Sequence, residues 1–138
     1  MTSKEQKNKK LVRHIFTEIG KGNHQPFMET LSEDFTVHVT GSTPFSGTYR
    51  GVKEVTEKMV APLMTCFETP PKVFVDQLIA EGDYVVLIAH GEGGTAKNGV
   101  AYNNTYCHVM RLNDGKLVES TEYYDTALAI EADLRPQS

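Results

Sequence analysis

The sequence predicts an α+β fold in a single domain spanning residues 1–138. Apolar residues recur at helical intervals in the first third of the chain, whereas residues 72–124 alternate between apolar and polar side chains as β-strands do. No internal repeat or linker divides the chain, and its length is sufficient to bury a hydrophobic core. Helices followed by a run of strands are typical of a layered α+β domain.

Two helices are expected at the N-terminus. Ser3 and Gln6 have the spacing of a capping box, which starts a helix. The apolar periodicity then continues to Gly20 and Gly22, which end this first helix. A second, shorter helix is predicted over residues 25–31.

The next segment is predicted to hold a turn, a strand, a loop and a third helix. Residues 32–34 are expected to turn the chain into a strand over 35–41, where apolar and polar residues alternate. The glycine, proline and serine content of residues 41–51 predicts a loop. Apolar residues on one stripe of residues 52–65 predict the third helix.

Pro70 and Pro71 separate the helices from a series of strands. The turns at Glu81-Gly82-Asp83 and Asn113-Asp114-Gly115 suit antiparallel hairpins. The expected strands cover residues 72–80, 83–93, 101–112 and 116–124.

Composition and charge limit the classes of partner and the cellular compartment expected for this protein. The net charge of −4 argues against nucleic acid, and the basic residues between Lys4 and Arg13 fit a solvated helix face. Cys66 and Cys107 are too few for a disulfide framework or a zinc site, so they are expected to be free thiols in a reducing compartment. No apolar run approaches the length of a membrane span, and no secretory signal is visible. A cytoplasmic protein without membrane association is expected.

The last hairpin concentrates ionisable and aromatic groups. Alternation places one set of side chains together on its first strand and another on its second, as expected of the wall of a small-molecule pocket. These sets are Tyr102, Asn104, Tyr106, His108 and Met110, and then Glu122 and Tyr124.

The order and spacing of several short motifs resemble the nuclear transport factor 2-like superfamily, and within it the SnoaL-like polyketide cyclase and ketosteroid isomerase branch. The similarity covers about residues 8 to 130. It rests on Ser32-Glu33-Asp34-Phe35, Gly41 with Phe45-Ser46-Gly47-Thr48-Tyr49-Arg50-Gly51, Glu81-Gly82-Asp83, Asp114-Gly115-Lys116-Leu117-Val118-Glu119 and Glu122-Tyr123-Tyr124-Asp125-Thr126. The resemblance implies a curved antiparallel sheet wrapped as a cone around the N-terminal helices, in a cystatin-like arrangement. It also implies an apolar pocket at the open end and a homodimer that pairs through the outer sheet face.

The resemblance also allows the catalytic positions of its branches to be compared. The positions of the ketosteroid isomerase base and its two oxyanion donors match Val39, Ile15 and His108, so steroid isomerisation by that mechanism is not expected. The acid/base carboxylate and the histidine of the polyketide cyclases match Glu122 and His108. The resemblance therefore implies proton transfer at a carbon next to a carbonyl, with no cofactor and no metal.

Each candidate has a structural alternative. His108 could act on the substrate or simply bond across the sheet, and Glu122 could be an acid/base or a carboxylate at the rim. Asp125 could cap a C-terminal helix or replace Glu122 as the pocket carboxylate. A small, largely apolar organic ligand is expected against a wall that includes Phe16, Val39, Phe45, Met59, Ile88, His90, Asn104, Tyr106, Met110 and Tyr124.

Two other functions remain open on the same fold. A non-catalytic ligand-binding module would keep the pocket but place no carboxylate within reach of the ligand. A dimerisation or scaffold protein would instead require a filled cone and an additional exposed apolar patch. His38, with a parity opposite to Val37 and Val39, is expected to be structural or to lie at a dimer face.

Overall fold

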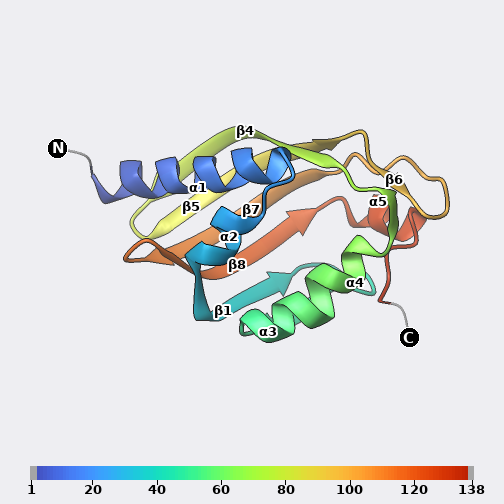
Figure 1. Ribbon diagram of the computed structural model, residues 1–138, viewed down its shortest axis with the longest axis horizontal. Helices are drawn as coiled ribbons and strands as arrows, with labels where there is room; N and C mark the ends of the chain where they lie inside the picture. The colour runs from blue at the N-terminus through green and yellow to red at the C-terminus, as the bar shows by residue number, and fades with distance from the viewer. Residues whose placement is uncertain (1–2, 137–138) are drawn as a thin grey trace.

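The computed structural model describes residues 3–136, which form a curved six-stranded sheet with helices packed on one face (Figure 1). The strand order is β2-β1-β8-β7-β5-β4. The strands are β1 (Leu31–Val39), β2 (Gly47–Arg50), β4 (Lys72–Glu81), β5 (Tyr84–Glu92), β7 (Thr105–Asn113) and β8 (Lys116–Tyr124). A second, two-stranded sheet pairs β3 (Phe67–Thr69) with β6 (Thr95–Ala96). The α+β class and the antiparallel-rich curved sheet are confirmed, although β1 and β8 run parallel to each other.

The helices are α1 (Lys4–Gly20), α2 (Gln25–Thr30), a continuous segment over residues 52–64, and α5 (Thr126–Glu131). The capping box of α1 is confirmed, because Ser3 Oγ accepts from Gln6 N at 3.1 Å and Gln6 Oε1 accepts from Ser3 N at 3.2 Å. The segment 52–64 comprises α3 (Val52–Glu54), a π-helical portion (Val55–Val60) and α4 (Ala61–Met64). A π-helical turn within a helix is frequent beside functional sites.

Three predicted boundaries were wrong. Residues 32–34 lie inside β1 rather than in a turn. The loop predicted over 41–51 contains β2, a short edge strand whose pairing with β1 depends on backbone groups and leaves little trace in the side-chain pattern. The strand predicted from residue 101 begins at Thr105, because the Asn104 side chain accepts the hydrogen bond of the Thr105 N–H and interrupts the ladder.

The main hydrophobic core lies between α1 and the sheet. Val12 and Ile15 of α1 are fully buried, as are Val85, Leu87 and Leu117 of the strands. Complete burial of one such aliphatic side chain contributes about 1.5–3 kcal/mol. This core fixes α1 on the sheet and with it one side of the pocket described below.

A second apolar cluster lies near the C-terminal end of the described chain. It includes Phe45, Cys66, Phe67, Tyr102 and Leu134, all buried. Figure 1 shows α5 beside β6 at the same end of the molecule. The space between this cluster and the main core is where the pocket opens.

The opposite face of the sheet is partly apolar and exposed. Phe74, Ile79, Tyr84 and Tyr123 each expose more than two-fifths of their surface. No helix in the part of the chain described is long and apolar enough to cross a membrane.

Candidate functional site

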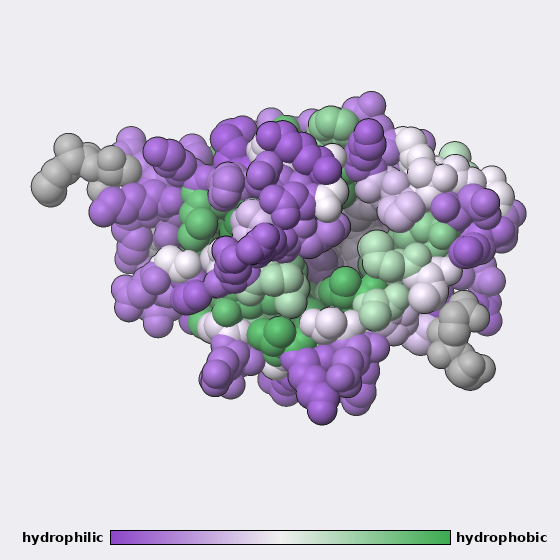
Figure 2. All heavy atoms as spheres, viewed as in Figure 1, coloured by the Kyte–Doolittle hydropathy of each residue, from purple (hydrophilic) through white to green (hydrophobic). Residues whose placement is uncertain are grey.

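A pocket of about 500 Å³ opens between the C-terminal end of α1, the helical segment 52–64 and the ends of β7 and β8. Figure 2 shows the hollow with apolar side chains beside it. Its apolar wall includes Val39, Phe45 and Met59, which were predicted to line it, together with Leu63 and Phe67. The volume lies in the range of small-molecule sites.

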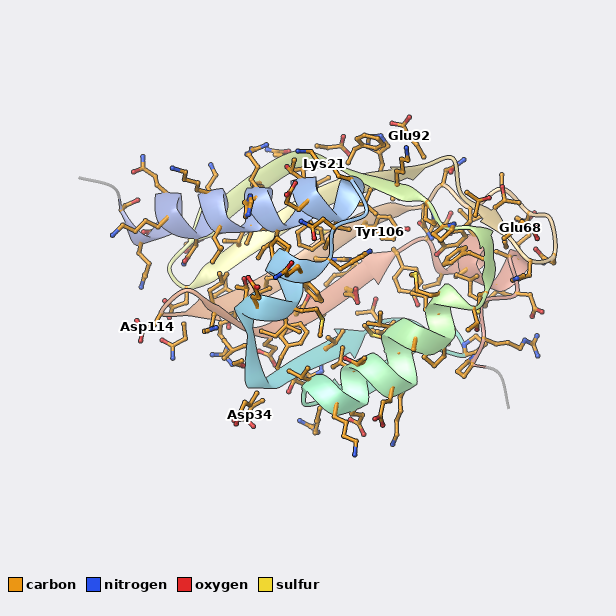
Figure 3. The ribbon with its side chains drawn as sticks, viewed as in Figure 1. Lys21, Asp34, Glu68, Glu92, Tyr106 and Asp114 are labelled. Atoms are coloured by element: carbon orange, nitrogen blue, oxygen red, sulfur yellow. The ribbon has the colours of Figure 1, made fainter. Side chains whose placement is uncertain are left out.

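The polar wall of the pocket comes from β7 and β8. Tyr106 and Tyr124 are opposite each other in the antiparallel register, and so are His108 and Glu122. Since side chains two residues apart share a strand face, all four project to the same side. All four line the pocket. Figure 3 shows Tyr106 between α1 and the helical segment 52–64.

His108 and Glu122 form a close pair, with His108 Nε2 at 3.4 Å from Glu122 Oε1. Their side chains are 15% and 23% exposed. The rings of Phe16 and Tyr106 present edges to the imidazole, with centroids at 6.1 and 5.9 Å. Within residues 3–136, the Glu122 carboxylate has no other polar side-chain partner. The carboxylate can therefore receive a proton from a molecule in the pocket.

The tyrosines near the pair remain protonated at neutral pH. Burial raises the pKa of Tyr102 to about 12 and raises that of Tyr106 even more, and the nearby Glu122 charge adds to both shifts. Burial also raises the pKa of Tyr49. A neutral phenol can donate a hydrogen bond to a carbonyl or enolate oxygen.

Asn104 has a structural position rather than one on the pocket wall. Its Nδ2 donates to the Tyr102 hydroxyl at 2.8 Å and to the Asp125 carbonyl at 3.0 Å. Its Oδ1 accepts from the backbone N–H groups of Thr105 at 2.7 Å and Asp125 at 2.9 Å. Both ends of this buried amide are occupied by protein groups, so the prediction that Asn104 lines the pocket wall was wrong.

Asp125 caps a C-terminal helix, which was one of its two predicted roles, and does not line the pocket. It is the N-cap of α5, and its carboxylate accepts from the Leu128 N–H at 3.2 Å. The prediction that Phe16 and Met110 line the pocket was wrong, because both belong to the main core. Phe16 borders the His108 ring without reaching the pocket surface. Glu122 is therefore the carboxylate that the described chain presents to the pocket.

The inward orientation predicted for Ile88 and His90 was wrong. Val85, Leu87 and Ala89 are the buried residues of β5, so Ile88 and His90 face the outer side of the sheet. There His90 Nδ1 lies 2.8 Å from Asp76 and Nε2 lies 2.8 Å from Glu92, and the ring stacks on Phe74. The two carboxylates, Asp76 first, raise the pKa of His90.

Some pocket residues were missed. Thr43 lies in an irregular loop, where no periodicity shows which way a side chain points. Tyr102 was placed on the hairpin face but not among the site residues. Lys21 and His24 between α1 and α2, and Lys72 at the start of β4, were not considered. Residues 3–136 contain no group of three or more His, Cys, Asp or Glu side chains arranged to hold a metal ion.

The chain was compared with known proteins. No curated protein matches it. Three similar solved structures are an NTF2-like protein of unknown function from Burkholderia pseudomallei, a putative SnoaL-like polyketide cyclase from Jannaschia sp., and TerC co-crystallised with polyporic acid. The first is 22% identical with a TM-score of 0.78, covering 91% of this chain and 95% of that one. The Jannaschia protein is 22% identical with a TM-score of 0.76, covering 96% of this chain and 95% of that one. TerC is 17% identical with a TM-score of 0.75, covering 89% of this chain and 95% of that one.

A family model described as the SnoaL-like domain matches residues 12–120, which is most of the chain. The matched range contains the main core, the strands β5 and β7 with His108, and the first half of β8, and it ends two residues before Glu122. The chain belongs to the SnoaL-like domain family.

Proposed function

We propose that this protein binds a small, largely apolar carbonyl compound and transfers a proton at the carbon next to the carbonyl, as a cyclase or isomerase does. The observation that carries the proposal is the Glu122–His108 pair, which lies 3.4 Å apart in a mainly apolar pocket. Such a site, with few polar groups in an apolar surround, suits recognition of one organic molecule.

Each polar group has a defined role in this proposal. Glu122 accepts the proton as the C–H bond breaks, and the electron pair of that bond becomes an enolate. Tyr106 donates a hydrogen bond to the enolate oxygen. His108, its neighbour on the same face of β7, orients the Glu122 carboxylate and stabilises its charge. Return of the proton to another carbon gives isomerisation, whereas attack of the enolate carbon on a second carbonyl gives cyclisation.

Two relatives support this ligand class. The Jannaschia protein is described as a putative polyketide cyclase, and TerC was co-crystallised with polyporic acid. The scaffold alternative required a filled cone, and a pocket of about 500 Å³ does not fit that requirement. The ligand-binding alternative differs from our proposal in that the carboxylate would take no proton.

The protein is further proposed to be a cytoplasmic, single-domain homodimer. The outer sheet face supports the dimer, because Phe74, Ile79, Tyr84 and Tyr123 expose apolar area there. An uncovered apolar sheet face is typical of an interaction surface.

Deuterium exchange tests the proton transfer. Incubation with 1-tetralone in D₂O, followed by ¹H NMR, reports loss of the hydrogens next to the ketone. The wild type should accelerate this exchange, and Glu122→Gln should reduce the catalysed rate by about 100-fold or more. Glu119→Gln is the matched control, because Glu119 is on the same strand but binds His38 on the outer face. Exchange that survives Glu122→Gln would contradict the proposal.

A further inference from the structure

A chain of hydrogen bonds joins the loop after β1 to the pocket. Ser46 Oγ donates to the Thr40 carbonyl at 2.9 Å and accepts from the Thr43 N–H at 2.8 Å. The directions are fixed, because a carbonyl only accepts and a backbone N–H only donates. The single hydroxyl hydrogen of Ser46 is therefore committed to Thr40.

The direction of the next two bonds follows from that. Thr43 Oγ1 lies 3.0 Å from Ser46 Oγ, so Thr43 must donate there. Thr43 Oγ1 also accepts from the Phe45 N–H at 3.3 Å. Its own hydrogen is now used, so the Tyr124 hydroxyl, 3.0 Å away, must donate to Thr43. A hydroxyl has only one hydrogen, which leaves the Tyr124 oxygen as an acceptor alone.

We propose that Thr43, acting through Tyr124, determines ligand specificity by making the Tyr124 oxygen an acceptor that selects a hydroxyl or amino group on the ligand. This inference rests on the proposed function, since it concerns the ligand of the same pocket. Thr43 is buried, and both Thr43 and Tyr124 line the pocket, so their bond sets the polarity of a hydroxyl on the pocket wall.

Tyr102 has the opposite polarity. The two backbone N–H groups that donate to Asn104 Oδ1 fix the orientation of that amide, so Asn104 Nδ2 donates to the Tyr102 oxygen. The hydrogen of the Tyr102 hydroxyl is left for another acceptor. The pocket thus presents donors at Tyr102 and Tyr106 and acceptors at Tyr124 and Glu122. The matching substrate class is a cyclic ketone that carries a hydroxyl or amino group on the ring away from its carbonyl.

A pair of matched ligands tests this polarity. Isothermal titration calorimetry gives the Kd of 6-hydroxy-1-tetralone and of 6-methoxy-1-tetralone, which differ by the loss of one hydrogen-bond donor. The wild type should bind the hydroxy compound about 5- to 10-fold more tightly. This ratio is expected for one hydrogen bond to the Tyr124 oxygen, which the methoxy compound leaves unpaired. Tyr124→Phe should reduce this ratio to about twofold or less, whereas Tyr123→Phe, on the exposed outer face, should leave it unchanged.

Thr43→Val tests the role of Thr43 itself. It removes the acceptor that holds the Tyr124 hydrogen, so Tyr124 can donate to either ligand and the preference should fall to about twofold or less. Thr43→Ser keeps the hydroxyl, so this variant should retain the wild-type preference for the hydroxy compound. Because the steric difference between the ligands is the same in every variant, a change in the ratio reports polarity.

The outcomes separate this inference from the proposed function. Equal affinities for the two ligands in the wild type, or a ratio unchanged in both Thr43→Val and Tyr124→Phe, would overturn the specificity role while leaving deuterium exchange intact. Failure of both substituted tetralones to bind, together with no accelerated exchange of 1-tetralone, would overturn both.

Discussion

Replacing Asn104 with alanine should destabilise the fold, because the side chain is 1% exposed and is a structural connector. It donates two hydrogen bonds, to Tyr102 and the Asp125 carbonyl, and accepts two, from Thr105 and Asp125 N–H groups. A buried hydrogen bond contributes about 1 kcal/mol net. Thr105 is exposed and can bond to water instead, so we expect a loss of about 3 kcal/mol in the free energy of unfolding.

Urea denaturation followed by circular dichroism measures this loss, and the corresponding fall in Tm is about 10 °C for a domain of this size. Asn103→Ala is the matched control. Asn103 is exposed and its side chain accepts one hydrogen bond, from the Gly94 N–H at 2.9 Å, so its loss should be about 1 kcal/mol or less. A loss below about 1 kcal/mol for Asn104→Ala would refute the view that its amide makes all four hydrogen bonds within the protein.

Three further predictions concern the outer face and the core. Protonated His90 is stabilised by Asp76 and Glu92, which raise its pKa, so its contribution to stability is present below about pH 6.5 and is lost as pH rises through the folded pKa. The Tm difference between wild type and His90→Gln should therefore be larger at about pH 5.5 than at about pH 9, and equal differences would contradict the ion pairs. Leu87→Ala should lower the free energy of unfolding by about 3–5 kcal/mol in urea titration, because Leu87 is fully buried in the main core, and a loss under about 1 kcal/mol would contradict that packing. Ile79→Glu should halve the mass seen by sedimentation velocity if the outer face forms the dimer, and an unchanged mass would place the interface elsewhere.

The sequence predicted the pocket wall best where polar and apolar residues contrast. On β7 and β8, His108 and Glu122 stand out from their neighbours, and alternation together with the Asp114-Gly115 turn predicts that they share a face. The pairing of these two strands in register then places the side chains opposite each other. No long-range information beyond the hairpin was needed for this pair.

Alternation failed on β5 for a physical reason. It shows which residues share a face but not which face points inward, and residues 85–89 are apolar on both sides. His90 was therefore assigned to the pocket with Ile88, although Leu87 and Ala89 are the buried set. A sheet whose outer face is also apolar removes the contrast on which such assignments depend.

Local sequence patterns could not predict the irregular loop, the edge strand or the parallel strand pairing. Thr43 reaches the pocket through a loop whose path is set by hydrogen bonds with Ser46 and Tyr124, a partner far along the sequence. The short edge strand β2 is defined by its pairing with β1, and the parallel pairing of β1 with β8 joins strands from opposite ends of the chain. Such arrangements follow from tertiary contacts rather than from residue spacing.

A crystal structure of the complex with 6-hydroxy-1-tetralone tests the central claim most directly. We expect the ligand to occupy the pocket with the carbon next to its ketone about 3–3.5 Å from the Glu122 carboxylate. We also expect the ketone oxygen to lie within hydrogen-bond distance of the Tyr106 hydroxyl. A ligand bound with this carbon turned away from Glu122, or bound outside the pocket, would contradict proton transfer by Glu122.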